Sequence, residues 1–213
     1  MLVSEKDIFR IPDEIDFKSA AASLEGAHYA YTFIHKTNIQ SGQKIFINGA
    51  TGAIGSALLQ FVKQYDVKIA ATADTENIEL IKSLGADKVY DYTKVDFTAD
   101  REKFDFIFDA VGKSTFGKCQ HMLTDKGIYI SSELGPFAQN VFYPLFNSVK
   151  KRKVIFPVPF SYHKTIPYIQ KALKKGVFKP VIDREYVLND ISEAYEYVLS
   201  GKKTGNVMVS IIN

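Results

Sequence analysis

The chain has 213 residues, 46% of them hydrophobic and 24% charged, which is enough for one substantial core or for one domain with an attached lobe. Its formal net charge of +3 is too small to indicate nucleic acid or an anionic membrane as the main partner. The single cysteine, Cys119, excludes an internal disulfide and fits a cytoplasmic location. No apolar run is long enough to span a bilayer, and residues 1–17 lack the order of a signal peptide.

Predicted elements follow one another in a regular order. Residues 1–18 are expected to be extended, since Pro12 does not fit a helix interior, and a helix is predicted over 19–37 with Ser19 as its N-cap. Beyond it, strands and helices alternate. The predicted strands are 44–48, 67–73, 88–92, 104–112, 127–135 and 153–158. The predicted helices are 54–64, 77–85, 113–123, 138–151 and 163–176.

This alternation predicts parallel strands joined by crossover helices. Strands that are covered on both faces have continuous apolar sequences, and FDFIFDA at 104–110 is one. We therefore expect an α/β fold: a Rossmann-type doubly wound parallel sheet with helices on both faces.

A glycine-spaced turn follows the first predicted strand in IFINGATGAIGSALLQFVK, residues 45–63. Its placement between a strand and a helix is typical of dinucleotide-binding turns, although Ala50 replaces the first glycine of G-x-G-x-x-G. Gly52 would allow backbone amides to approach a pyrophosphate, and Gly55 would allow the helix to pack close to the strand. The helix N-terminus adds free donors and a positive partial charge. A tight turn without a ligand is the alternative.

Five segments in this order carry a family resemblance: INGATGAIGSALLQFVK, IELIKSLGADKVYDYT, FDFIFDAVGKS, GIYISSELG and KPVIDREYVLNDISEAYEYVLSGKKTGNVMVSI. The chain resembles the medium-chain dehydrogenase/reductase superfamily, in the zinc-independent, alcohol dehydrogenase-like branch that includes quinone oxidoreductase. The resemblance implies NAD(P)H-dependent hydride transfer to a quinone, enone or aldehyde. It also implies a dinucleotide-binding domain over 19–178, and remnants of a β-rich catalytic domain at 1–18 and 179–213, the latter a strand, a helix and a strand.

The catalytic residues are unknown, because the resemblance places most of them in a catalytic domain that this chain lacks, so the chain alone is expected to be inactive. Its partner would be a small carbonyl or quinone substrate, with no nucleic acid and no membrane. Two alternatives remain open: a nucleotide-binding module that senses or regulates without turnover, and a truncated product without activity.

Ligands of an open parallel sheet bind beyond the carboxyl ends of its strands. On the resemblance, the residues expected to bind NAD(P) are Asn48, Gly49, Ala50, Thr51, Gly52, Ala53, Ile54, Gly55, Thr72, Asp74, Tyr92, Ala110, Val111, Gly112, Ser131, Ser132 and Glu133. Asp109 is expected to orient loop amides rather than act as a base. Lys202 and Lys203 lie near a basic cofactor contact of relatives, and a solvated turn is the favoured interpretation.

The choice between NAD and NADP stays undecided. Asp74, Thr75 and Glu76 stand where NADP-preferring relatives tend to carry a small polar residue and a Lys or Arg, which favours NAD. Tyr92 matches a tyrosine beside the 2′-phosphate in quinone oxidoreductases, which favours NADP. Asp74 is equally compatible with a loop acid or a helix cap.

No metal site is expected. The catalytic zinc ligand that relatives draw from this part falls near Leu24, and the four histidines lack ligand spacing, with His28 and His35 taken as an aromatic pair on a core-facing helix. The Tyr-x-x-x-Lys spacing of Tyr90 and Lys94 is treated as chance. A homodimer is expected through the edge strand Lys153–Phe160, whose apolar run would otherwise be an exposed edge.

Overall fold

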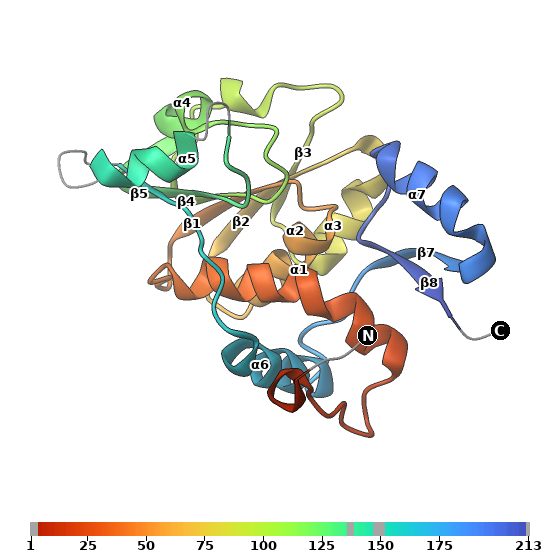
Figure 1. The fold of residues 1–213 in the computed structure, drawn as a ribbon. Helices are drawn as coiled ribbons and strands as arrows, with labels where there is room; N and C mark the ends of the chain where they lie inside the picture. The colour runs from red at the N-terminus through yellow and green to blue at the C-terminus, as the bar shows by residue number, and fades with distance from the viewer. Residues whose placement is uncertain (1–3, 136–138, 147–151, 212–213) are drawn as a thin grey trace.

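The computed structural model describes residues 4–135, 139–146 and 152–211. Six parallel strands form one sheet in the order β3-β2-β1-β4-β5-β6, which confirms the predicted Rossmann-type α/β fold (Figure 1). These strands are β1 Lys44–Asn48, β2 Lys68–Ala73, β3 Lys88–Asp91, β4 Phe104–Asp109, β5 Leu123–Ser131 and β6 Lys153–Ile155.

Helices lie on both faces of the sheet. The first buried cluster joins the sheet to α1 Phe17–His35, α2 Ala53–Val62, α3 Ile78–Leu84 and α6 Tyr162–Lys174. The second, on the other face, includes residues of α4 Phe116–Cys119 and of the short turns η3 Phe97–Ala99, η4 Gln120–Met122 and η6 Tyr143–Phe146. The further elements are η1 Glu5–Asp7, η2 Thr75–Asn77, α5 Gln139–Phe142 and η7 Leu188–Asp190. Among the described residues, no helix has both the length and the apolar character needed to cross a membrane.

The C-terminal part contains the predicted strand, helix and strand: β7 Ile182–Val187, α7 Ile191–Leu199 and β8 Asn206–Ser210. β7 and β8 pair in parallel with each other and not with the main sheet. An isolated bridge between Gly205 and Gly52 connects this unit to the glycine-spaced turn.

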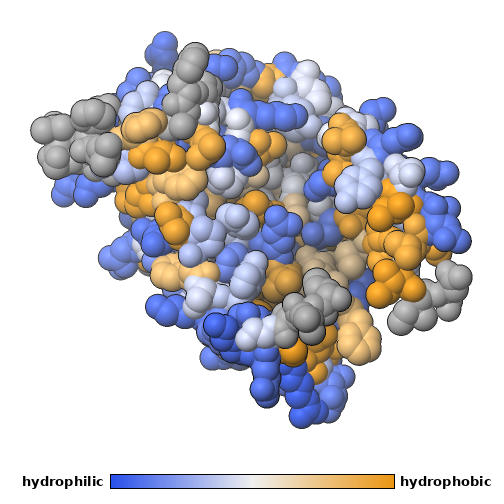
Figure 2. Space-filling model, viewed as in Figure 1, coloured by the Kyte–Doolittle hydropathy of each residue, from blue (hydrophilic) through white to orange (hydrophobic). Residues whose placement is uncertain are grey.

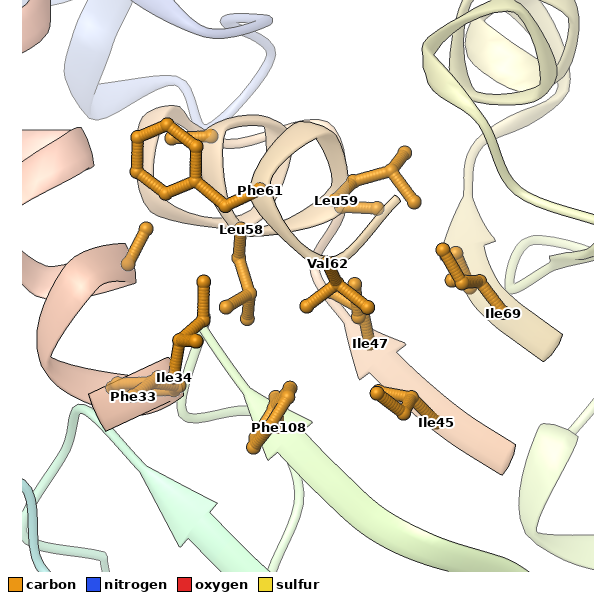
Figure 3. Close-up of a cluster of buried hydrophobic side chains, with 14 of the residues drawn as sticks. Phe33, Ile34, Ile45, Ile47, Leu58, Leu59, Phe61, Val62, Ile69 and Phe108 are labelled. Carbon is orange, nitrogen blue, oxygen red and sulfur yellow. The ribbon is translucent and has the colours of Figure 1, made fainter. Parts of the chain in front are cut away.

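The core centres on α2, which is buried on nearly all sides because α1 covers it on one side and the sheet on the other. Leu58, Leu59, Phe61 and Val62 of α2 are fully buried. Figure 3 shows Leu58 and Val62 pointing toward Ile34 of α1, the β1 residues Ile45 and Ile47, and Phe108 of β4. Phe61 lies on another side of α2, where its ring packs against Tyr168 and Phe178. A helix that is apolar on all sides is stable only when it is enclosed in this way.

The N-terminus of α1 differs from the prediction. The helix begins at Phe17 and its N-cap is Asp16, not Ser19. The Asp16 carboxylate accepts bonds from the Ser19 amide and the Ser19 hydroxyl, both at 2.7 Å. Aspartate caps a helix as well as serine does, so the chain uses the first of two competent residues.

Two further predicted elements are shorter than expected, and a third can be tested only in part. The helix predicted over 113–123 is reduced to α4 and η4. It begins late because its N-cap is Thr115, whose hydroxyl accepts from the Lys118 amide, and it ends early because β5 begins at Leu123. The last strand ends at Ile155, since Pro157 and Pro159 cannot donate to a ladder. Of the helix predicted over 138–151, only α5 and η6 fall within the described residues that can test it.

Close packing at two glycines brings α2 to the end of β1 and α1 to α2. A Cβ on Gly55 of α2 would lie 2.1 Å from the Gly49 carbonyl oxygen, and one on Gly26 of α1 would lie 2.7 Å from the Ala53 carbonyl oxygen. The expected packing role of Gly55 is thus confirmed: only hydrogen fits between α2 and the end of β1.

We predict that Gly55→Ala destabilises the chain by about 3 kcal/mol, at the upper end of overpacking costs, because its new methyl group meets rigid backbone atoms. The matched control is Gly117→Ala in α4, where the added Cβ meets nothing nearer than 3.8 Å. Urea unfolding followed by circular dichroism should separate the two variants. Equal midpoints for Gly55→Ala and the unsubstituted chain would contradict the packing argument.

Candidate functional site

The carboxyl ends of β1, β2, β4 and β5 are held together by a chain of hydrogen bonds. The Gly49 amide donates to the Thr72 hydroxyl at 2.8 Å, and that hydroxyl donates to Asn48 Oδ1 at 2.9 Å. Asn48 Nδ2 then donates to Asp109 Oδ1 at 3.0 Å. Several predicted site residues therefore form one connected network at the expected edge of the sheet.

Asp109 lies at the centre of this network and is fully buried. Its Oδ1 also accepts from the Gly112 amide at 3.0 Å, and its Oδ2 accepts from the Tyr129 hydroxyl at 2.8 Å. Burial, and then the neighbouring Asp109 carboxylate, raise the pKa of Tyr129, so this hydroxyl stays a donor. Asp109 thus orients loop amides, as expected from the sequence, while Tyr129 is a member that the sequence analysis missed.

The glycine-spaced turn is tightly packed at Gly49 and open at Gly52. Gly49 has a φ of +81°, a conformation that side chains disfavour, and a Cβ there would lie 2.6 Å from Val111 Cβ. At Gly52, the N-cap of α2, an added Cβ would meet nothing nearer than 3.6 Å. The first amides of α2 have no acceptor within the helix, so the turn offers donors next to the open space at Gly52.

The loop before β8 lies directly on this turn. The Gly205 amide donates to the Thr51 carbonyl oxygen at 2.6 Å, which brings Lys203 close to the turn. Lys202 is exposed, but Lys203 is half-buried, and burial lowers the pKa of its ammonium group. The solvated interpretation therefore holds for Lys202 and is wrong for Lys203, because the pairing of Gly205 with the turn draws the loop inward.

A second group of predicted residues lies at the ends of β2 and β3. Asp74 caps η2: its Oδ1 accepts from the Asn77 amide at 3.0 Å and from Asn77 Nδ2 at 2.8 Å. Tyr92, after β3, is half-exposed, and its pKa is raised by partial burial and then by the charges of Asp74 and Asp91. The Thr204 hydroxyl donates to Asn77 Oδ1 at 3.3 Å, so the C-terminal unit also contacts this group.

A third group lies between the ends of β4 and β5. A Cβ on Gly112 would lie 2.1 Å from Glu133 Cγ, so these two segments touch. The Glu133 amide donates to the Ser131 hydroxyl at 3.2 Å, and the Ser132 amide donates to the Asp109 carbonyl oxygen at 3.1 Å. Val111 remains partly exposed beside Gly49. The three groups share one edge of the sheet.

A polar cavity of about 610 Å³ adjoins the second group, between the loops that follow β3 and β4. Tyr92 and Lys94 line one side, and Lys113 and Lys118 line the other. None of the three lysines was singled out in the sequence as a cofactor contact, because nothing in the local sequence distinguishes them from ordinary surface lysines.

Within the described ranges, no group of three or more His, Cys, Asp or Glu side chains could hold a metal ion. Leu24 is exposed on α1, and His28 is buried with its Nδ1 2.8 Å from the Thr165 hydroxyl. Tyr90 donates to Asp100 at 2.6 Å, whereas Lys94 pairs with Asp91 at 3.1 Å, so the two side chains have different partners.

Comparison with known proteins agrees with this architecture. The zinc-binding dehydrogenase family profile matches residues 84–209. The chain is 31% identical over 211 residues to 2-methylene-furan-3-one reductase of Solanum lycopersicum, and 31% identical over 214 residues to the chloroplastic NADPH-dependent alkenal/one oxidoreductase of Arabidopsis thaliana. Each match covers 97% of this chain and 50% of the relative, so the chain spans about half the length of these relatives.

Among solved structures, the quinone oxidoreductase of Coxiella burnetii superposes with a TM-score of 0.84 at 21% sequence identity. The match covers 95% of this chain and 63% of that one, and it shows a shared fold.

We predict that Asp109→Asn lowers the free energy of unfolding by about 1–3 kcal/mol, because the amide group presents a donor to buried donors and leaves them unsatisfied. The matched control is Asp125→Asn, an exposed acid at the opposite end of β5, which should change stability by less than about 0.5 kcal/mol. Urea unfolding at pH 7 measures both. Wild-type stability of Asp109→Asn would show that the network does not depend on the carboxylate.

Proposed function

The chain belongs to the zinc-binding dehydrogenase family, in the medium-chain dehydrogenase/reductase superfamily, and on that premise we propose that it is the nicotinamide cofactor-binding part of an oxidoreductase. The substrate of the whole enzyme would be a quinone, an enone or an aldehyde. The observation that carries this proposal is the turn at Gly49–Gly55, which leaves open space at Gly52 beside the amides at the start of α2.

The residues of the turn fit a dinucleotide. Unpaired amides at a helix N-terminus, together with the helix dipole, bind the pyrophosphate of such cofactors. Lys203, half-buried against the same turn, adds a positive charge. The Ala110–Gly112 and Ser131–Glu133 segments, fixed by Asp109 and by each other, would contact the nicotinamide half. The bound cofactor supplies the hydride, and this chain holds and orients it.

A substrate pocket would require residues beyond these 213. An apolar groove of about 740 Å³ runs between the N-terminal segment, α1, α6 and β8. Figure 2 shows apolar surface on this side of the molecule, and Phe17, Leu24 and Ile211 are exposed there. These features support the division into a cofactor domain over 19–178 and flanking segments that pack against a substrate domain. The buried free Cys119 is compatible with the proposed cytoplasmic location.

We predict that the 213-residue chain binds NADH or NADPH in calorimetric titration, and that Gly52→Ala weakens this binding by about tenfold. The added methyl group has room in the fold but would occupy the space next to the α2 amides. Gly117→Ala, remote from the turn, should bind like the unsubstituted chain. Absence of binding to either cofactor would contradict the proposal for this chain.

A non-catalytic sensor module is the second candidate function, favoured only by the lack of an identified catalytic residue in the described part of the chain. Quinone or enone reduction distinguishes the two, measured on the longer protein if the reading frame extends upstream of Met1. Reduction with turnover supports the enzyme, whereas cofactor binding without reduction supports the sensor.

We also propose a homodimer through β6, which stands at the end of the sheet order next to β5. Light scattering at micromolar concentration should give twice the chain mass. The variant expected to yield monomers is Ile155→Lys, because Ile155 is a half-buried residue of β6. Val154→Lys is unsuitable because Val154 is buried and a lysine there would disturb the fold. A strictly monomeric unsubstituted chain would contradict the dimer.

A further inference from the structure

The loop that follows β5, residues 132–135, is fixed at its start by neighbouring strand ends. The Ser132 amide donates to the Asp109 carbonyl oxygen at 3.1 Å, and a Cβ on Gly112 would lie 2.1 Å from Glu133 Cγ. On the proposed function, on which this inference rests, the first part of this loop contacts the nicotinamide half of the cofactor. The far end of the loop must be fixed as well if the loop is to present one surface to that ligand.

Asn140 of α5 holds the far end of the loop through two hydrogen bonds, which we call the Asn140 clamp. Its side-chain Nδ2 donates to the Glu133 carbonyl oxygen at 2.8 Å, and its backbone amide donates to the Leu134 carbonyl oxygen at 3.0 Å. Gly135 has a φ of +71°, and a Cβ there would lie 2.9 Å from Asn140 Nδ2. One residue thus binds two successive carbonyl groups of the loop, across a turn with no room for a side chain at Gly135.

The clamp is anchored in the second buried cluster. Tyr143, in η6 directly after α5, packs against Phe116 of α4 with their ring centroids 5.3 Å apart. Asn140 is buried, whereas its neighbours Val141 and Phe142 are exposed, so α5 turns Asn140 toward the protein. The Asn140 clamp therefore connects the loop after β5 to the packed interior on that face of the sheet.

Packing alone does not explain an asparagine at this position. Asn140 Oδ1 is buried and has no hydrogen-bond partner in the described part of the chain. An unsatisfied buried oxygen lowers stability, and a leucine of similar size would fill the space without that cost. Ser132 Oγ, the other buried side-chain atom without a partner among the described residues, lies on the same loop. Such atoms are rare in protein interiors, and departures of this kind concentrate where a site uses the residue for its function.

We propose that Asn140 is a positioning residue for the nicotinamide half of the cofactor and acts through the carbonyl groups of Glu133 and Leu134. Asn140 touches no cofactor atom itself, since it is only 1% exposed. By fixing the loop before the cofactor arrives, it removes the ordering cost that a free loop would add to binding. The adenosine half would lie toward β2, on the other side of β1 and β4 in the sheet order, so its binding should not depend on Asn140.

The test compares the complete cofactor with the same molecule without its nicotinamide ring. The 213-residue chain is titrated calorimetrically with NADH and ADP-ribose, or with NADPH and 2′-phospho-ADP-ribose where NADPH binds more tightly. We expect the unsubstituted chain to bind the complete cofactor several-fold more tightly than the ring-free ligand. Asn140→Ala should lose most of this ratio and keep its affinity for the ring-free ligand. A general loss of structure would weaken both ligands equally and would leave the ratio unchanged.

Asn140→Asp keeps the shape of the side chain and makes its donor depend on pH. A carboxylate cannot donate to the Glu133 carbonyl oxygen, whereas the protonated acid can, and burial raises the pKa of a carboxyl group. The ratio for this variant should therefore be low at alkaline pH and should rise toward that of the unsubstituted chain as the pH falls to mildly acidic values. The unsubstituted chain should keep its ratio over the same range.

Val141→Ala is the matched control, because it shortens an exposed side chain of the same helix and should keep the ratio. Thermal melts verify that all variants fold. The positioning role is overturned if Asn140→Ala keeps the ratio or weakens both ligands equally, or if the unsubstituted chain binds both ligands equally well. In each of these cases binding of the ring-free ligand still supports the proposed function, whereas absence of binding of either ligand to the unsubstituted chain overturns that function too.

Discussion

The buried carboxylate of Asp109 is the interaction on which the rest of the site depends. A charge removed from water is costly unless donors surround it, and here donors come from β1, β5 and the loop after β4. Through Asn48 and Thr72 the same network reaches β2 and the Gly49 amide. Each bond constrains the direction in which a loop leaves its strand, so the cofactor edge is fixed by polar contacts within an otherwise apolar core.

Close backbone packing is the second constraint, and it works with the first. Gly55 and Gly26 let α1 and α2 approach the turn until only hydrogen atoms fit, and Gly205 brings the C-terminal unit against the same turn. The turn is therefore enclosed on its protein side and open at Gly52. These close contacts fix the conformation of the turn by steric exclusion. The amides of the turn are therefore held in one direction, which a flexible loop would not achieve.

Much of this could be predicted from the sequence. The strand Lys44–Asn48 has the predicted bounds, because a short apolar run between Gly42 and Gly49 permits no other choice. The tight packing at Gly55 was also predicted, from the spacing of the glycines between the first strand and the helix that follows it. The role of Tyr129 and the burial of Lys203 were not, because each depends on which distant segment approaches a residue. The N-cap at Asp16 was not either, because Asp16 and Ser19 are both competent caps. Local propensity cannot decide between two capping residues, and it contains no information about a loop that arrives 150 residues later along the chain.

The polar contacts around Asp109 and those around Asp74 and Asp91 differ in how many loops a substitution would affect. Asp109 and its partners are buried and mutually satisfied, so a substitution there alters the positions of several loops at once. Asp74 and Asp91 are bonded mainly to residues of their own loops, by Asn77 and Thr93, with Thr75 bridging the two strand ends. Charge at the ends of β2 and β3 can therefore be altered without disturbing the network around Asp109. A substitution at Asp109 is therefore expected to move several loops together, whereas one at Asp74 or Asp91 is expected to act within its own loop.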